Sequence, residues 1–131
     1  MSCARAKISM EACEGATFEK SFVWKAGDPP VEVDLTGYTG ACHVRDSISD
    51  ETPVFDLQLD AGFFIKDQGT DPGGYFFRIL DSETSNTCPK HKSRRMVYDL
   101  RLVSPEGEVK LQQYGDFTIY PAVTRPWQQT P

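Results

Sequence analysis

The chain has 131 residues, of which 39% are hydrophobic and 25% charged, and its formal net charge is −5. This length fits one domain with a proper core, and the composition argues against a wholly disordered chain. The acidic balance disfavours nucleic acid or an anionic membrane as a partner, because both attract positively charged proteins. No apolar run approaches the length of a membrane span, and the first ten residues lack the apolar stretch of a signal peptide, so we expect synthesis in the cytoplasm.

The first half of the chain alternates apolar and polar residues with the two-residue period of β-strands. Phe18, Phe22 and Trp24 fall on one side of a predicted strand. The stretch 27–30, GDPP, ends that strand, and the stretch 34–40, DLTGYTG, supplies turn residues before the next one.

The strand after this turn carries an adjacent cysteine and histidine, Cys42 and His43. Neighbours in a strand point to opposite faces, so these two side chains cannot bind one metal ion together. His91 follows Cys88 by three residues and would need further ligands from elsewhere in the chain. We therefore predict neither a metal site nor a cofactor.

The second half continues the alternation. The stretches 53–60, 61–67 and 71–80 each read as a strand, and 94–123 reads as a hairpin around the turn SPEGE. In that hairpin, Gly115 is the expected position of a β-bulge.

The polar stretch between these strands, 81–93, shows no alternation. Asp81 or Ser82 is expected to cap one helical turn there, and Pro89 prevents a longer helix. Together these elements predict an all-β fold, a small antiparallel β-sandwich of immunoglobulin-like type with seven to eight strands. The predicted organisation is an N-terminal arm at 1–7, the sandwich at 8–124 and a C-terminal arm at 125–131.

Four cysteines are many for a small cytoplasmic domain: Cys3, Cys13, Cys42 and Cys88. They are either buried free thiols or thiols that form disulfides, within the chain or between subunits, after the protein leaves the cell. Cys3 in the arm and Cys88 in the long loop are the better candidates for an inter-subunit disulfide. We expect Cys13 and Cys42 to be buried.

One basic cluster stands out at 90–95, KHKSRR, with Lys90, Lys92, Arg94 and Arg95. It contains no aromatic residue to stack on a base, which disfavours nucleic acid. The alternatives are contact with an acidic patch on a partner protein and an ordinary solvated loop. We identify no catalytic residue, because the carboxylates of the predicted strands fall on their polar faces.

The order of several motifs resembles that of small structural proteins of tailed bacteriophages. The resemblance spans residues 8–125, and its motifs are Gly15–Phe18, Asp34–Thr39, Arg45, Tyr98–Leu100, Gly115 and Pro121–Arg125. It implies an immunoglobulin-like or baseplate-adaptor-like sandwich that is a virion component without catalytic activity. The chain departs from the pattern at 82–93, where the family has a short Ala-rich helical stretch, and in its four cysteines.

The resemblance also implies roles for individual residues. We expect Leu35 and Tyr38 to pack their turn onto the core and Arg45 to pair with a carboxylate. Arg125 and Trp127 of the C-terminal arm are candidate contacts with other virion proteins, because a tryptophan is a frequent interface anchor. Trp127 could equally fold back onto its own domain.

Three functions remain in competition. The first is a virion protein that bridges larger components and forms a homo-oligomer within the particle, in the neck, collar, tail or baseplate, with capsid decoration next. The second is a carbohydrate- or receptor-binding module, which would use several exposed rings among Phe63, Phe64, Tyr75, Phe76 and Tyr114. The third, a small cysteine enzyme or metalloprotein, has the least support.

Overall fold

The computed structural model describes residues 6–124, and this part of the chain contains eleven strands and two short helical turns. The strands are β1 (Ala6–Lys7), β2 (Met10–Cys13), β3 (Phe18–Val23), β4 (Lys25–Ala26), β5 (Val31–Glu32), β6 (Thr39–Arg45), β7 (Phe55–Leu59), β8 (Gly62–Ile65), β9 (Gly74–Ile79), β10 (Arg94–Val103) and β11 (Val109–Tyr120). The helical turns are α1 (Asp81–Thr84) and a 3₁₀ turn at Pro89–His91. The prediction of an all-β fold is confirmed. Three of the strands, β1, β4 and β5, have two residues each, which is too short for an alternating pattern to reveal.

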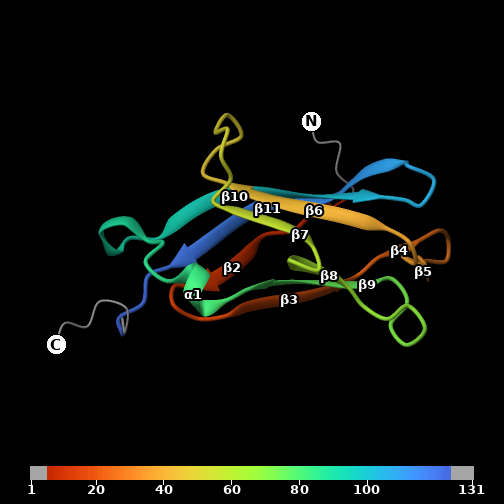
Figure 1. Cartoon of the computed structure of the whole chain (residues 1–131), viewed down its shortest axis with the longest axis horizontal. Helices are drawn as coiled ribbons and strands as arrows, with labels where there is room; N and C mark the ends of the chain where they lie inside the picture. The colour runs from red at the N-terminus through yellow and green to blue at the C-terminus, as the bar shows by residue number, and fades with distance from the viewer. Residues whose placement is uncertain (1–5, 125–131) are drawn as a thin grey trace.

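Nine of the strands form one continuous sheet in the order β1-β11-β10-β6-β7-β8-β9-β3, with β2 also paired to β11. The sheet curls so that β6, β7, β10 and β11 make one layer and β3, β8 and β9 the other (Figure 1). Most pairs are antiparallel, but β1 and β2 both run parallel to β11, and β7 runs parallel to β8. The strands β4 and β5 form a separate hairpin at one end of the molecule.

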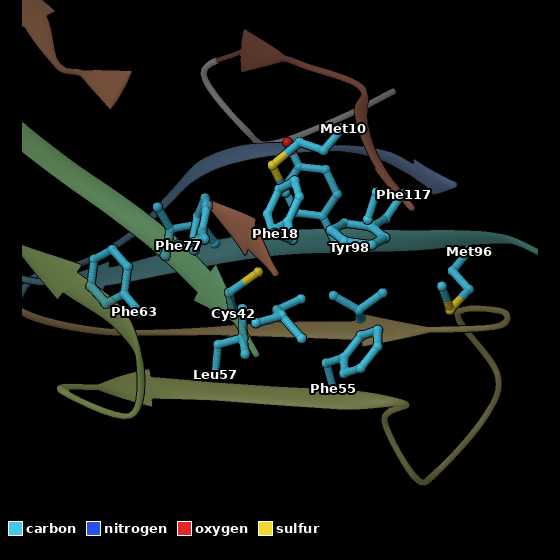
Figure 2. Close-up of a cluster of buried hydrophobic side chains, with 14 of the residues drawn as sticks. Met10, Phe18, Cys42, Phe55, Leu57, Phe63, Phe77, Met96, Tyr98 and Phe117 are labelled. Carbon is cyan, nitrogen blue, oxygen red and sulfur yellow. The ribbon is translucent and has the colours of Figure 1, made fainter. Parts of the chain in front are cut away.

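The core fills the space between the two layers (Figure 2). The ring of Phe117 in β11 lies 5.1 Å from that of Phe18 in the opposite layer and 6.1 Å from that of Phe55 in β7, measured between centroids. Alternate residues of each strand supply the rest of the core, as the two-residue period predicts. In β10 these buried residues are Met96, Tyr98, Leu100 and Leu102.

The bulge in the β10–β11 hairpin lies elsewhere than expected. The register shifts between Leu100 and Arg101, which face Gln113 and Leu111, so Gln112 is the extra residue. Gly115 serves another purpose: a Cβ at this position would collide with the carbonyl oxygen of Ile8. The glycine therefore allows the chain between β1 and β2 to pass close to β11.

The stretch after β9 forms a single helical turn, α1, as predicted, but its N-cap is Leu80 and not Asp81 or Ser82. The hydroxyl of Thr84 at its end is buried, donates to the carbonyl oxygen of Ala16 at 2.8 Å and accepts from the N–H of Gly15 at 3.1 Å. This helical turn thereby fixes the turn that leads into β3. No helix within residues 6–124 is long and apolar enough to cross a membrane.

The turn before β6 packs onto the core as the sequence suggests. Leu35 is fully buried, and the ring of Tyr38 meets that of Trp24 edge to face at 6.2 Å. At the N-terminus, Ala6 and Lys7 of the expected arm pair with β11 as β1. The other residues of both arms, including Cys3, Arg125 and Trp127, lie outside the described residues.

Candidate functional site

A groove of about 770 Å³ runs over the outer face of β6, β10 and β11. Its floor is made by the outward-facing residues of these strands, and its sides by Lys7 of β1 and by Ile48 in the loop after β6. In Figure 1 the loop after β6 rises above the layer that contains the three strands. The lining residues are Lys7, His43, Arg45, Ile48, Val97, Tyr98, Asp99, Arg101, Leu111, Tyr114, Gly115 and Asp116.

The histidine in this groove, His43, has both ring nitrogens engaged. Its Nε2 lies 3.0 Å from Oδ1 of Asp56 on the neighbouring strand, and its Nδ1 lies 2.9 Å from a guanidinium nitrogen of Arg45. Because a guanidinium can only donate, Nδ1 accepts and the proton of a neutral ring sits on Nε2. The lone pair that a general base needs is thus occupied, and the groove lining contains no serine, threonine or cysteine to act as a nucleophile.

Arg45 also secures one wall of the groove. Its other terminal nitrogen donates to the carbonyl oxygens of Asp50 and Glu51, at 3.0 and 2.8 Å. The expectation that Arg45 pairs with a carboxylate is therefore wrong: its acceptors are a histidine ring and two backbone carbonyls. The positions of the two carbonyls depend on how the loop after β6 folds back over that strand, and a sequence motif does not reveal the course of a loop.

Of the other charged residues in the groove, Asp116 forms an ion pair, whereas Asp99 and Arg101 form none with residues 6–124. Asp116 forms an ion pair with Arg95 at 2.7 Å, and the hydrogen bond from Arg95 lowers the pKa of Asp116. Asp99 and Arg101, two residues apart on β10, form no ion pair with any residue between 6 and 124. The groove therefore offers one carboxylate and one guanidinium to a bound group, beside the apolar side chains of Val97 and Leu111.

The basic cluster is divided by the fold. Arg94 forms two hydrogen bonds to the carboxylate of Asp46, at 2.8 and 2.7 Å, which raise the pKa of Arg94 and lower that of Asp46. Arg95 holds Asp116, as described above. Lys90 and Lys92 are exposed and form no ion pair within the described part of the chain. The two lysines, more than the two arginines, are thus available to a partner.

The cysteines correct two expectations. Cys13 was expected to be buried but is exposed, because Met10 and Ala12 take the inward positions of β2. Cys88 was expected to be accessible in its loop but is buried: its N–H donates to Oε2 of Glu14 at 2.8 Å, and its thiol to the carbonyl oxygen of Ile119 at 3.4 Å. Cys42 is buried as predicted. All three are free thiols, and burial raises the pKa of Cys42 and Cys88.

Alkylation with a maleimide should accordingly modify Cys13 and spare Cys42 and Cys88 in the folded protein, because a thiol reacts through its exposed thiolate. Peptide mapping by mass spectrometry separates the sites, and labelling in denaturant provides the reference for complete reaction. Modification of Cys88 at the rate of Cys13 would show that the loop around it opens readily.

Two buried polar groups were not singled out from the sequence. Glu14 is 4% exposed and its carboxylate accepts from the N–H groups of Cys88 and Ala122, at 2.8 and 3.3 Å. Gln113 is 1% exposed; its Nε2 donates to the Tyr98 hydroxyl at 3.0 Å, and its Oε1 accepts from the Tyr75 hydroxyl. Gln113 lies in β11, where the alternation only assigns a face, and Glu14 lies in the turn after β2, so the sequence offers no signal for their partners.

The aromatic residues considered for sugar binding do not form a platform. Phe63 and Tyr75 belong to the core. Phe64 and Phe76 stack on each other with centroids 4.8 Å apart and planes 15° apart, and the Arg78 guanidinium lies within 5.5 Å of both ring centres. Tyr114 is half-buried in the groove. The rings thus cover one another instead of presenting adjacent flat faces.

Among residues 6–124, no group of three or more His, Cys, Asp or Glu side chains is arranged to hold a metal ion. A comparison with models of known protein families finds no match to the chain, and a comparison with curated proteins finds none either.

Proposed function

We propose that this chain is a non-enzymatic structural component of a tailed-phage virion, where it bridges or reinforces larger particle proteins. The neck, collar, tail or baseplate is the favoured location, ahead of decoration of the capsid. Its partners in this proposal are other virion proteins and further copies of the same chain. The second reading, a sugar-binding module, loses support because the candidate rings are buried or stacked on one another.

One observation carries the proposal: two motifs of the resemblance, Gly15–Phe18 and Asp34–Thr39, form turns that lead into strands of a single β-sandwich. The Gly15–Phe18 segment is held by Thr84 and ends in the core. In the Asp34–Thr39 turn, the carboxylate of Asp34 accepts from the N–H and hydroxyl of Thr36 at 2.9 and 2.6 Å. Motifs that maintain a scaffold are typical of a protein whose role is assembly, because such a role needs a rigid body with exposed edges and surfaces.

The geometry of the groove agrees with a binding role. His43 has no free lone pair, and Asp99 and Arg101, which have no ion pair within residues 6–124, are suited to recognition of another protein by charge and hydrogen bonds. A surface of this kind is compatible with assembly and does not require a reaction.

The proposal is tested on purified particles, probed for this chain on reducing and non-reducing gels after a high-salt wash. We expect the chain to remain with the particles and, without reductant, to form a ladder that collapses to the mass of a single chain on reduction. The structure now makes Cys13 the described thiol best placed for such a link, so Cys13→Ser should weaken the ladder and Cys88→Ser should not. A single band in both lanes would remove the disulfide part of the proposal. Absence of the chain from washed particles would refute the virion assignment.

A further inference from the structure

The groove over β6, β10 and β11 has the chemical features of a binding site for an extended segment. Two of its apolar positions are Val97, two residues before Asp99 on β10, and Leu111, which faces Arg101 from β11. Neither Asp99 nor Arg101 has an ion pair among residues 6–124. Beside them Ile48 projects from the loop with 88% of its surface exposed. A matching occupant needs a large apolar side chain and a cation close to each other. It also binds more tightly if it loses little conformational entropy on binding.

The segment 125–131 of this chain, RPWQQTP, has that chemistry. Trp127 is a large aromatic group of the kind that anchors interfaces, and it can also stack on the guanidinium of Arg101. Arg125 supplies the cation for Asp99. Pro126 restricts its own φ and favours an extended conformation for Arg125, which lowers the cost of ordering the segment.

The spacing also matches. Side chains two residues apart in an extended segment are about 6.5–7 Å apart, which is the spacing of Val97, Asp99 and Arg101 along β10. An extended segment with Arg125 beside Asp99 therefore places Trp127 over one of the flanking positions, at Val97 or at Arg101 with its neighbour Leu111. Both positions present a surface that suits an indole ring.

The described chain ends outside this groove, since no described residue after Asp116 lines it. The N–H of Ala122 donates to Glu14 at 3.3 Å, which holds the exit beside the end of β2. In Figure 1, β11 ends near α1, at the left of the molecule. A second copy can bring its segment 125–131 to the groove without having to start from this point.

We propose that the groove binds residues 125–131 of a neighbouring copy of this chain, with Trp127 on the apolar part of the floor and Arg125 paired with Asp99. Each copy then donates one segment and accepts another, which is a head-to-tail contact that closes into a ring or continues as a filament. The proposed function includes contact between copies of the chain, and this inference names the groove and the segment that make it. It does not depend on the virion assignment, since it is a property of the pure protein.

Sedimentation equilibrium of the full chain, in reductant so that thiols make no links, tests the proposal over a wide range of protein concentrations. The wild-type chain is expected to self-associate. Trp127→Ala, Arg125→Asp and Asp99→Arg should each weaken association at least about tenfold, as loss of an interface anchor or of a charge pair does. The double variant that combines Asp99→Arg with Arg125→Asp should recover most of the loss, because it restores the pair with its charges exchanged.

Glu106→Arg is the matched control, because it makes the same change in charge at an exposed residue of the β10–β11 turn, outside the groove lining. All these substitutions affect residues that are exposed or lie beyond the described sandwich, so folding should be unchanged, as circular dichroism checks. A wild-type chain that stays monomeric at every concentration would overturn the proposal. Association that is as strong in Asp99→Arg as in the wild-type chain would also overturn it. The same holds if the double variant associates no more tightly than either single variant. Because the experiment uses the pure protein without particles, its outcome does not affect the virion assignment, which the particle gels test separately.

Discussion

Replacing Phe117 by alanine is expected to lower the free energy of unfolding by about 3–5 kcal/mol, the range for removal of a buried phenylalanine side chain. The Phe117 side chain is fully buried, and it contacts Phe18 of β3 and Phe55 of β7. Since β3 belongs to the opposite layer, the cavity would open at the junction of the two layers. A protein of this size is stable by only about 5–15 kcal/mol, so the variant should be close to the limit of folding.

Urea denaturation followed by circular dichroism measures this change. Val123→Ala is the control, because Val123 is 93% exposed and its truncation should change the free energy by less than about 0.5 kcal/mol. A loss below about 1 kcal/mol for Phe117→Ala would mean that the two layers do not pack through this ring.

Replacing Gln113 by leucine should produce the second-largest loss. The Tyr75 hydroxyl would lose its acceptor inside the core, which costs about 1–3 kcal/mol for a buried group left without a partner. The Tyr98 hydroxyl would lose the donor Nε2 but would keep the carbonyl oxygen of Ile8, to which it donates at 2.5 Å. Burial already raises the pKa of Tyr98 to about 12, which indicates how strongly this site disfavours an uncompensated charge.

Two further variants separate the hydrogen bonds from simple packing. Gln112→Leu should cost less, because Oε1 of Gln112 is buried with no hydrogen-bond partner among the described residues, and its removal relieves a penalty. Tyr75→Phe in the Gln113→Leu background should cost much less than Tyr75→Phe alone, since its hydroxyl has already lost that acceptor. Strictly additive losses would contradict a direct link between Tyr75 and Gln113.

Local pattern was sufficient to predict the longer strands, but not β1, β2, β4 and β5. The alternation in β3, β7 and β10 identifies both the strands and the faces that become buried, because neighbouring side chains in a strand point to opposite sides whatever the rest of the chain does. Turn residues such as Gly37 and Gly107, both with positive φ, mark the breaks between strands for a similarly local reason. Cys42 and His43 on opposite faces follow from the same rule.

The candidate site depends on contacts that no local pattern contains. Cys88 is buried through a hydrogen bond to Glu14, 74 residues earlier, and Cys13 is exposed because β2 runs parallel to β11 with its other face inward. The groove exists only because β10 lies between β6 and β11 and a loop folds back over them. Amino-acid order thus determined which segments are strands and which of their faces are apolar. Strand order and long-range hydrogen bonds determined which polar side chains meet, because those depend on the position of every other strand in the sheet.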